Sequence, residues 1–433
     1  MWSAVSHAWQ SWKRAKAVAA LAIAALAVGI GSATAIYTVV NTVMVRPLPY
    51  PQGDRFVALY GASLRDPDGR SSHAYPTLLE YQQRTRSFDI FGWFKPENLN
   101  LTSPGQPQHV DGAAVTPSLA HHLGVNPAIG RWFQDETGVV LSHALWTRLG
   151  SDPAMVGKAV TLNGRSYTVT GVMPPGFRLP VAGPGGGPVR SDVWIFLDPL
   201  GRGQSPGEGS NFCYARRKPG VTLAQAEADV KRVAADIARG NPALEPSYTA
   251  RLDDLHSDTV ESIRPTLLLL LAAAGLLLGI TCANVAALLL ARAVARGRET
   301  AVRVALGAAR RALALQYFVE GLFVSLTGAA AGVVMSLTLV RVVVTVAADY
   351  IPRAEEIAID WRVLVFAVGL AVLSSALSSL APLWQAMRTL PIDVLRDGVR
   401  VSAGARSRRL SRALVVAEIA LAFALLAGSV ALL

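Results

Sequence analysis

Long apolar runs alternate with polar stretches along this chain. The clearest run, Leu267 to Ala291, carries no charged residue over 25 positions. A helix of that length can cross a hydrocarbon core of about 30 Å. Similar runs lie at 17–45, 321–346 and 363–387, and another begins at 413. The pattern predicts a chain that crosses a membrane several times.

The first apolar run, 17–45, admits two interpretations. It follows basic residues at 13, 14 and 16, so a secretory signal peptide cleaved near Ala33-Thr-Ala35 is one of them. The run continues for ten residues past that site and further apolar runs follow, which favours an uncleaved first span. The clustered prolines of Arg46-Pro-Leu-Pro-Tyr-Pro51 then end the helix.

The polar stretch from 52 to 263 has the pattern of a folded, water-soluble domain. Residues 55–60 and the two arms of 160–170 are β-prone, and Asn163-Gly164 between the arms favours a type I′ hairpin turn. Residues 75–85 predict a helix with proline at its second position. Thr222 opens a capping-box pattern for a helix that ends before Gly240. Strands that alternate with helices predict an α/β or α+β domain.

Charge gives this pattern an orientation. The net charge is +11, yet 46–263 holds 21 basic and 21 acidic residues, so the excess lies beside the spans. Residues 292–311 contain six arginines against one acid, and a short loop of this kind stays in the cytoplasm. The acidic stretch 347–360 suits an outside loop. We therefore predict a cytoplasmic N-terminus and an extracytoplasmic domain, and the absence of a basic and aromatic stripe argues against nucleic acid as a partner.

The predicted fold class is a membrane protein: an α-helical transmembrane bundle with a large α/β (α+β) extracytoplasmic domain between the first two spans. The predicted segments are the cytoplasmic N-terminus 1–16, transmembrane helix 1 at 17–45, the extracytoplasmic domain 46–263, transmembrane helix 2 at 264–291, a cytoplasmic loop and helix 292–313, transmembrane helix 3 at 314–346, an external loop 347–360, transmembrane helix 4 at 361–387, a basic cytoplasmic linker 388–412 and the start of transmembrane helix 5 at 413–433.

Motifs for chemistry are weak in this sequence. It contains no G-x-x-x-x-G-K-[ST] phosphate loop, so the chain by itself is not expected to bind ATP in that manner. Gly203-Gln-Ser-Pro-Gly207 matches G-x-S-x-G, but proline follows the serine inside a Gly-rich loop, which is unlike a nucleophile elbow. His121 and His122 are adjacent and would point about 100° apart on a helix. We predict no catalytic, cofactor or metal residues.

Small residues in the spans indicate helix packing. Glycine pairs four residues apart let helix backbones approach closely, and a buried asparagine can bond a neighbouring helix; the alternative is that glycine is simply common in membrane helices. Glu320 and Glu418 lie near span ends, where an acid either has a function or pairs with nearby arginines. The helix-packing candidates are Gly275, Gly279, Asn284, Gly328 and Gly332.

Several motifs together resemble a known family. Arg298-Glu-Thr-Ala-Val-Arg-Val-Ala-Leu-Gly-Ala-Ala-Arg310, with Gln316-x-x-x-Glu320 after it, resembles the FtsX-like permeases of ABC transporters. Val140-Leu-Ser-His-Ala-Leu-Trp146 and Gly171-Val-Met-Pro-Pro-Gly-Phe177 are similar to the periplasmic core domain of MacB-type permeases. The first span and the prolines after it look most like the bacterial subgroup with duplicated permease units and no fused ATPase. The sequence stops in its fifth span, so a second unit is either missing or supplied by a homodimer.

The resemblance implies a function and its partners. We expect a permease subunit of an ABC-type exporter in the bacterial inner membrane, coupling ATP hydrolysis by a separate cytoplasmic ATPase to movement of its periplasmic domain, with a periplasmic adaptor as a further candidate partner. ATPase activity is expected in the partner and not in this chain. The alternative is a non-transporting regulator that signals to a cell-wall hydrolase or a sensor kinase. The substrate is not indicated by any residue. The candidates for contact with the ATPase are Arg298, Glu299, Val302, Arg303, Leu306 and Arg310.

Overall fold

The computed structural model describes residues 16–103, 106–179, 191–201, 209–240, 247–295, 310–346, 351, 353–388 and 402–430. The chain divides into two compact units. We call them the helical unit (Met1–Val43, Ile263–Ala348 and Glu356–Leu433) and the sheet unit (Met44–Ser262 and Asp349–Glu355).

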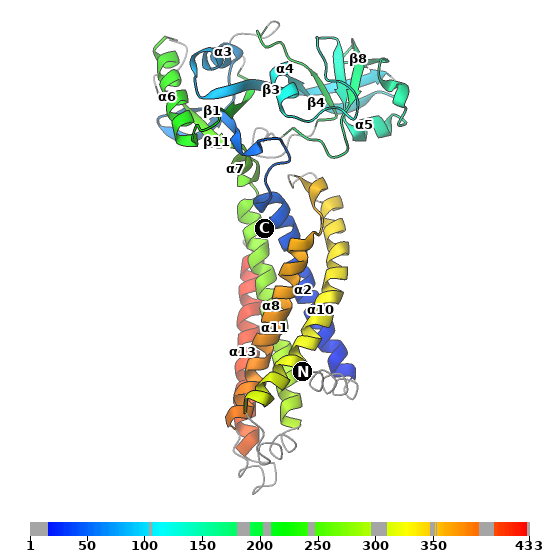
Figure 1. Cartoon of the computed structure of the whole chain (residues 1–433), viewed down its shortest axis with the longest axis vertical. Coiled ribbons are helices and arrows are strands. Elements are labelled where there is room, and N and C mark those ends of the chain that lie inside the picture. The colour runs from blue at the N-terminus through cyan, green and yellow to red at the C-terminus, as the bar shows by residue number, and fades with distance from the viewer. Residues whose placement is uncertain are drawn as a thin grey trace. The chain divides into compact units, whose positions relative to one another are not determined.

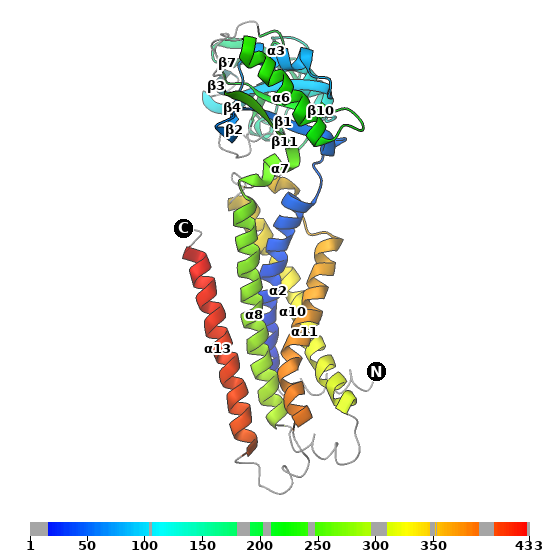
Figure 2. The same ribbon diagram turned by 90° about the vertical axis from the view of Figure 1, so that its left-hand side faces the viewer.

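Long apolar helices make up the described part of the helical unit (Figures 1 and 2). Helix α10 packs against α2 and α11, while α8 packs against α2, α11 and α13. Four of these helices are long and apolar enough to cross a membrane, at Lys16–Val45, Arg264–Ala295, Phe318–Val346 and Trp361–Leu380. The helices are α2 (Lys16–Val40), its π-helical continuation η1 (Asn41–Val45), α8 (Arg264–Ala295), α10 (Arg310–Val346), α11 (Trp361–Arg388) and α13 (Ser402–Val430).

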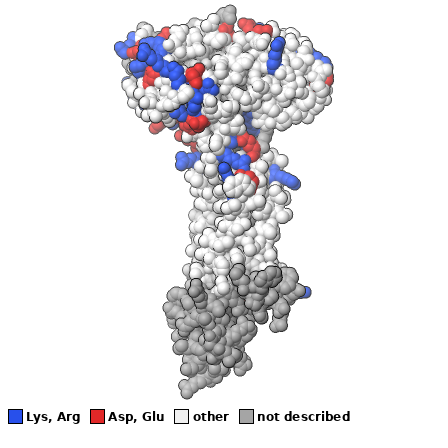
Figure 3. Space-filling model, in the orientation of Figure 1, with Lys and Arg blue, Asp and Glu red and all other residues white. Residues whose placement is uncertain are grey.

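The outward surface of these helices is apolar. Val334 and Leu337 on α10 and Val365 on α11 are exposed, which a soluble protein would avoid in a continuous belt. Charged side chains on the visible face gather over the sheet unit, and much of the described helical surface carries none (Figure 3). The chain is therefore a multi-pass membrane protein, as the apolar pattern predicts.

The sheet unit contains eleven described strands in one sheet, with the order β11-β1-β10-β3-β4-β9-β6-β8-β5; β2 pairs with β1, and β7 pairs with β3 and β8. The pairs β4–β9 and β6–β8 are parallel, and the others are antiparallel. The strands are β1 (Phe56–Ser63), β2 (Asp66–Ser71), β3 (Phe88–Ser103), β4 (Gln108–Val115), β5 (Ile129–Gly130), β6 (Gly138–Leu141), β7 (Ala159–Leu162), β8 (Arg165–Val172), β9 (Val193–Phe196), β10 (Phe212–Arg217) and β11 (Tyr248–Asp254).

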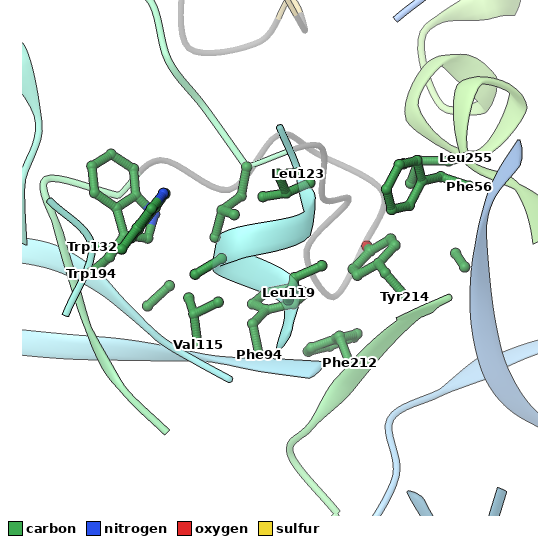
Figure 4. Packing of buried hydrophobic residues seen from close by; sticks show 14 of the residues in the cluster. Phe56, Phe94, Val115, Leu119, Leu123, Trp132, Trp194, Phe212, Tyr214 and Leu255 are labelled. Atoms are coloured by element: carbon green, nitrogen blue, oxygen red, sulfur yellow. The ribbon is translucent and has the colours of Figure 1, made fainter. Parts of the chain in front are cut away.

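Helices accompany this sheet on both faces, so β1 is buried on both sides. Side chains alternate between the faces of a strand, and along β1 Phe56 and Tyr60 belong to one core while Val57 and Leu59 belong to another. The second core includes α3 (Tyr75–Arg84) and α6 (Leu223–Gly240). In the first core, Leu119 and Leu123, on and just after α4 (Pro117–His122), pack between the aromatic side chains of the strands (Figure 4). Two further short helices are α5 (His143–Arg148) and α7 (Leu255–Glu261).

The local signals in the sequence are confirmed in the sheet unit. Asn163 and Gly164 both have positive φ, at 46° and 77°, and join β7 to β8 as a tight hairpin. The amide of Gln225 donates to Oγ1 of Thr222 at 3.3 Å, and the amide of Thr222 donates to Oε1 of Gln225 at 3.0 Å. This reciprocal pair is the capping box that opens α6. The fold class is the predicted one, an α/β domain accompanied by membrane-spanning helices.

A segment between α10 and α11 belongs to the sheet unit. Residues 349–355 group with it, although both neighbouring helices belong to the helical unit. Arg353 has a positive φ of 61° and donates from Nη1 to the Arg46 carbonyl at 2.8 Å and from Nη2 to the Pro47 carbonyl at 2.9 Å. The Arg353 side chain thus holds this segment to the chain that precedes β1.

Candidate functional site

The residues expected to contact an ATPase lie mostly outside the described part of the chain. Arg298, Glu299, Val302, Arg303 and Leu306 fall in 296–309, which the structure does not describe. Arg310 is the first helical residue of α10. The role of these residues stays a prediction, and what the structure adds is their place in the chain directly before α10.

Helices α2 and α10 are in backbone contact. A Cβ atom added to Gly332 on α10 would lie 2.9 Å from the Gly31 amide nitrogen and 2.9 Å from the Ala27 carbonyl oxygen of α2. A Cβ atom added to Gly31 would lie 2.8 Å from the Gly332 carbonyl oxygen. Cβ atoms do not approach other heavy atoms this closely, so only glycine fits at either position without a shift of the helices.

One of the two predicted glycine pairs takes part in this contact. A Cβ atom on Gly328 would lie 2.7 Å from Cβ of Leu26, so Gly328 and Gly332 both face α2. Gly275 on α8 faces open space. Gly279 faces only the side chain of Leu421 on α13, which a Cβ atom at this glycine would meet at 3.3 Å. Asn284, also on α8, is exposed.

Sequence reasoning missed the glycines of α2. Gly31 faces α10, and a Cβ atom on Gly29 would collide with Oγ1 of Thr281 on α8. Both glycines lie within the small-residue run of the first span, Gly29-Ile-Gly-Ser-Ala33. That run was the available signal, because small residues let membrane helices approach.

The serines of α11 bind the neighbouring helices. Ser375 donates its hydroxyl to the Phe318 carbonyl of α10 at 3.1 Å, and Ser378 donates to the Cys282 carbonyl of α8 at 3.2 Å. A Cβ atom on Gly321 of α10 would lie 2.9 Å from Oγ of Ser379, so α10 and α11 also approach closely here. Glu320, beside Gly321, is buried, at 5% exposure. Small hydroxyl side chains of α11 thus join this helix to α8 and α10.

A polar stripe runs along α2 and into η1. Thr34, Thr38, Asn41 and Thr42 recur at spacings of three and four and are all buried. Thr38 donates its hydroxyl to the Thr34 carbonyl at 2.7 Å. The stripe lies where the helix widens to π geometry at Asn41–Val45, a distortion that is often found at functional sites.

The weak chemical motifs gain no support from the described residues. His121 and His122 are exposed on α4, with their Nδ1 atoms 2.7 and 2.6 Å from the carbonyl oxygens one turn earlier. Among the residues that the structure describes, no group of three or more His, Cys, Asp or Glu could hold a metal ion. The segment Gly203 to Gly207 lies outside them. The main arrangement that the described residues offer is the close packing of the helices.

Comparison with protein families assigns both parts of the chain. Residues 19–233 match the family model of the MacB-like periplasmic core domain. Residues 271–391 match the model of the FtsX-like permease C-terminal domain. No curated protein matches the chain.

Three solved structures are similar to parts of this chain. A permease domain from Porphyromonas gingivalis is 15% identical, with 47% of this chain and 92% of that chain covered and a TM-score of 0.37. The extracellular domain of the noncanonic ABC-type transporter YknZ from Gram-positive bacteria is 12% identical, with 45% and 99% covered and a TM-score of 0.34. The periplasmic region of MacB from Actinobacillus actinomycetemcomitans is 11% identical, with 50% and 94% covered and a TM-score of 0.37.

Proposed function

Because the chain belongs to the MacB/FtsX-like permeases of ABC transporters, we propose that it couples ATP hydrolysis by a separate ATPase to movement of its sheet unit, for export of a substrate. Its N-terminus lies in the cytoplasm of a bacterium, its helices span the inner membrane and the sheet unit lies outside. The basic segment 292–311 and the neutral balance of 46–263 support this orientation.

The backbone contact between α2 and α10 carries this proposal. Helix α10 begins at Arg310, directly after the segment expected to touch the ATPase. At Gly31 and Gly332 the backbones of α2 and α10 meet directly, and the chain enters the sheet unit at Met44, within the η1 continuation of α2. A displacement of α10 along its axis therefore moves α2 with it, because closely packed helices shift as units.

The contact with the ATPase is a docked helix in this proposal. On a helix, Val302 and Leu306 fall on one face and serve as apolar anchors, with Arg298 and Arg303 beside them. The alternative is an amphipathic segment that rests on anionic lipid, held by about 1 kcal/mol per arginine. The two differ in which residues hold the segment in place.

Co-purification from membranes tests the docking. Leu306→Asp is expected to abolish recovery of the ATPase while the chain still inserts, because docking would bury an unpaired charge. The paired change Arg298→Ala and Arg303→Ala should weaken recovery less. Leu64→Asp is the matched control, since Leu64 is 69% exposed on the sheet unit and the same charge is added there. Unchanged recovery with Leu306→Asp, together with release from anionic vesicles by the arginine changes, would assign the segment to lipid.

A second permease unit is a further proposed partner. Helix α13 packs against α8 and exposes Val416, Ile419 and Phe423. In the bilayer these side chains suit either lipid or the helices of a second unit. Cysteine substitution at Ile419 tests this: an intermolecular disulfide in native membranes supports a homodimer, whereas a monomeric product despite efficient labelling assigns the face to lipid.

A further inference from the structure

A buried carboxyl group fixes the short helix α7 to the sheet. The Asp258 side chain on α7 is 1% exposed. Tyr60 on β1 donates its hydroxyl to Oδ2 of Asp258 at 2.9 Å. Arg70 on β2 lies with Nη2 3.6 Å from Oδ1 of Asp258, and its guanidinium stands over the Tyr60 ring at 5.5 Å from the centroid. One carboxyl group thus connects α7 to two strands.

Negative charge is crowded around this carboxyl group. Nη2 of Arg70 also lies 2.8 Å from Oδ2 of Asp253 on β11, and it contacts Glu261 at the end of α7. Three carboxyl groups therefore share one guanidinium. Arg251 offsets the charge of Asp253 alone among these three groups, since its Nε donates to Oδ1 of Asp253 at 2.8 Å. A proton on one carboxyl group would lower their mutual repulsion.

The surroundings make Asp258 the group that takes the proton. Burial, together with the charges of Asp253 and Glu261, raises the pKa of Asp258 to about 6, although the Tyr60 hydrogen bond and Arg70 act to lower it. Further titratable and charged groups lie at α7: His256 and Glu261 belong to the helix itself, and the elements packed on it carry Asp54, Arg55, Asp253 and Asp254. Burial raises the pKa of Tyr214 on β10 well above its ordinary value, and Arg55 of the short turn before β1 is paired with Asp89.

We propose that α7 is a proton-controlled latch: proton uptake by Asp258 holds α7 on the sheet, and proton release lets it open. Two residues separate α7 from α8 in the sequence, so the latch lies in the connection that leaves the sheet unit. This proposal does not depend on the transport role above. It depends on the contact of α7 with Tyr60 and Arg70.

The difference in the pKa of Asp258 between closed and open α7 determines how the opening of α7 depends on pH. Once α7 opens, Asp258 regains the ordinary carboxyl pKa of 3.8, whereas closed α7 holds the proton up to about pH 6. The closed form therefore binds more protons in this range, and the equilibrium constant for opening rises with pH. Between about pH 4.5 and about pH 7 the expected rise is roughly 20-fold.

Hydrogen exchange on the full chain in lipid nanodiscs tests the latch. The opening constant of the α7 amides, corrected for the intrinsic exchange rate, should rise roughly 20-fold over this pH range in the natural sequence. Asp258→Asn should remove this roughly 20-fold rise and keep α7 as protected as at low pH, and any smaller change that remains belongs to the other titratable groups at α7, such as His256. The amides of α6 in the same samples serve as an internal control and should not follow this profile.

A second variant keeps the test decisive where Asp258→Asn fails to fold. Tyr60→Phe removes a hydrogen bond that stabilises ionised Asp258, so the midpoint of the α7 profile should move to higher pH. A corrected opening constant that does not change with pH would overturn the proposal. The proposal would also be overturned if the pH dependence of the opening constant were the same in Asp258→Asn as in the natural sequence. The same holds if Tyr60→Phe did not shift the midpoint of that pH dependence.

Discussion

Gly31 on α2 and Gly332 on α10 face each other so closely that each occupies the place where the other would carry a side chain. A Cβ atom on Gly332 would lie 2.9 Å from the Gly31 amide nitrogen, and one on Gly31 would lie 2.8 Å from the Gly332 carbonyl oxygen. Both close contacts involve backbone atoms, which cannot turn away as a side chain can. The crossing therefore tolerates glycine and little else.

Gly332→Leu should separate α2 from α10. The added side chain collides with the backbone of α2, and overpacking of this kind costs about 1–3 kcal/mol. We expect a lower thermal midpoint in detergent and, with the ATPase present, loss of substrate-stimulated hydrolysis. Gly275→Leu is the matched control, since Gly275 has open space around it. This variant should keep the thermal midpoint and the substrate-stimulated hydrolysis of the natural sequence. If Gly332→Leu and Gly275→Leu lowered the thermal midpoint and the hydrolysis equally, the contact between α2 and α10 would have no special role in coupling.

Thr222→Ala should destabilise the start of α6. The change removes one of the two reciprocal hydrogen bonds of the capping box, and loss of an N-cap side chain costs about 1 kcal/mol. Faster amide exchange in the first turn of α6 measures this loss. Thr102→Ala is the control, because Thr102 is exposed near the end of β3 and its hydroxyl makes only a 3.5 Å contact. If the amide exchange rates of the first turn of α6 were unchanged in Thr222→Ala, packing alone would hold the N-terminal end of this helix in place.

Acidification should lower the stability of the sheet unit through His73. Its side chain is buried, and burial lowers the pKa of His73 to about 4, below the ordinary 6.5. Below about pH 6.5 His73 becomes protonated in the unfolded chain but stays neutral in the folded chain. The free energy of unfolding therefore decreases as pH falls toward 4. At about pH 5 this contribution amounts to about 2 kcal/mol.

Chemical unfolding of the full chain at about pH 5 and about pH 7.5 measures this contribution. His73→Gln should shrink the difference between the two pH values by about 2 kcal/mol, because glutamine does not titrate. The Asp258 effect has the opposite sign and persists in His73→Gln. A pH difference that survives the substitution at full size would assign it to other groups.

Cysteine labelling in intact cells should reveal the orientation. A cysteine at position 205 is expected to react with an impermeant maleimide, and one at position 309 only after the cells are opened. The two natural thiols, Cys213 and Cys282, are buried, which keeps the background low. The reverse pattern would place the sheet unit inside and contradict the proposed coupling.

Features set by neighbouring residues could be predicted from the sequence, and those set by distant ones could not. The Asn163-Gly164 hairpin and the Thr222 capping box depend on a few consecutive residues, and both occur as expected. Glycine pairs are visible in the sequence, but whether Gly275 or Gly328 meets a helix depends on how the helices are rotated in the bundle. Asp258 lies in a polar stretch that gives no sign of burial, because Tyr60 is 198 residues away.

The place of β1 in the sheet has a consequence for how the chain is made. β1 pairs with β10 on one side and with β11 on the other, so the earliest strand to be synthesised is bordered by the two latest. Until residue 212 has been synthesised, only the short strand β2 can cover its edges. An apolar strand with open edges is an aggregation hazard. The sheet unit therefore passes through a long stage in biosynthesis at which most of the backbone of its first strand is still unpaired.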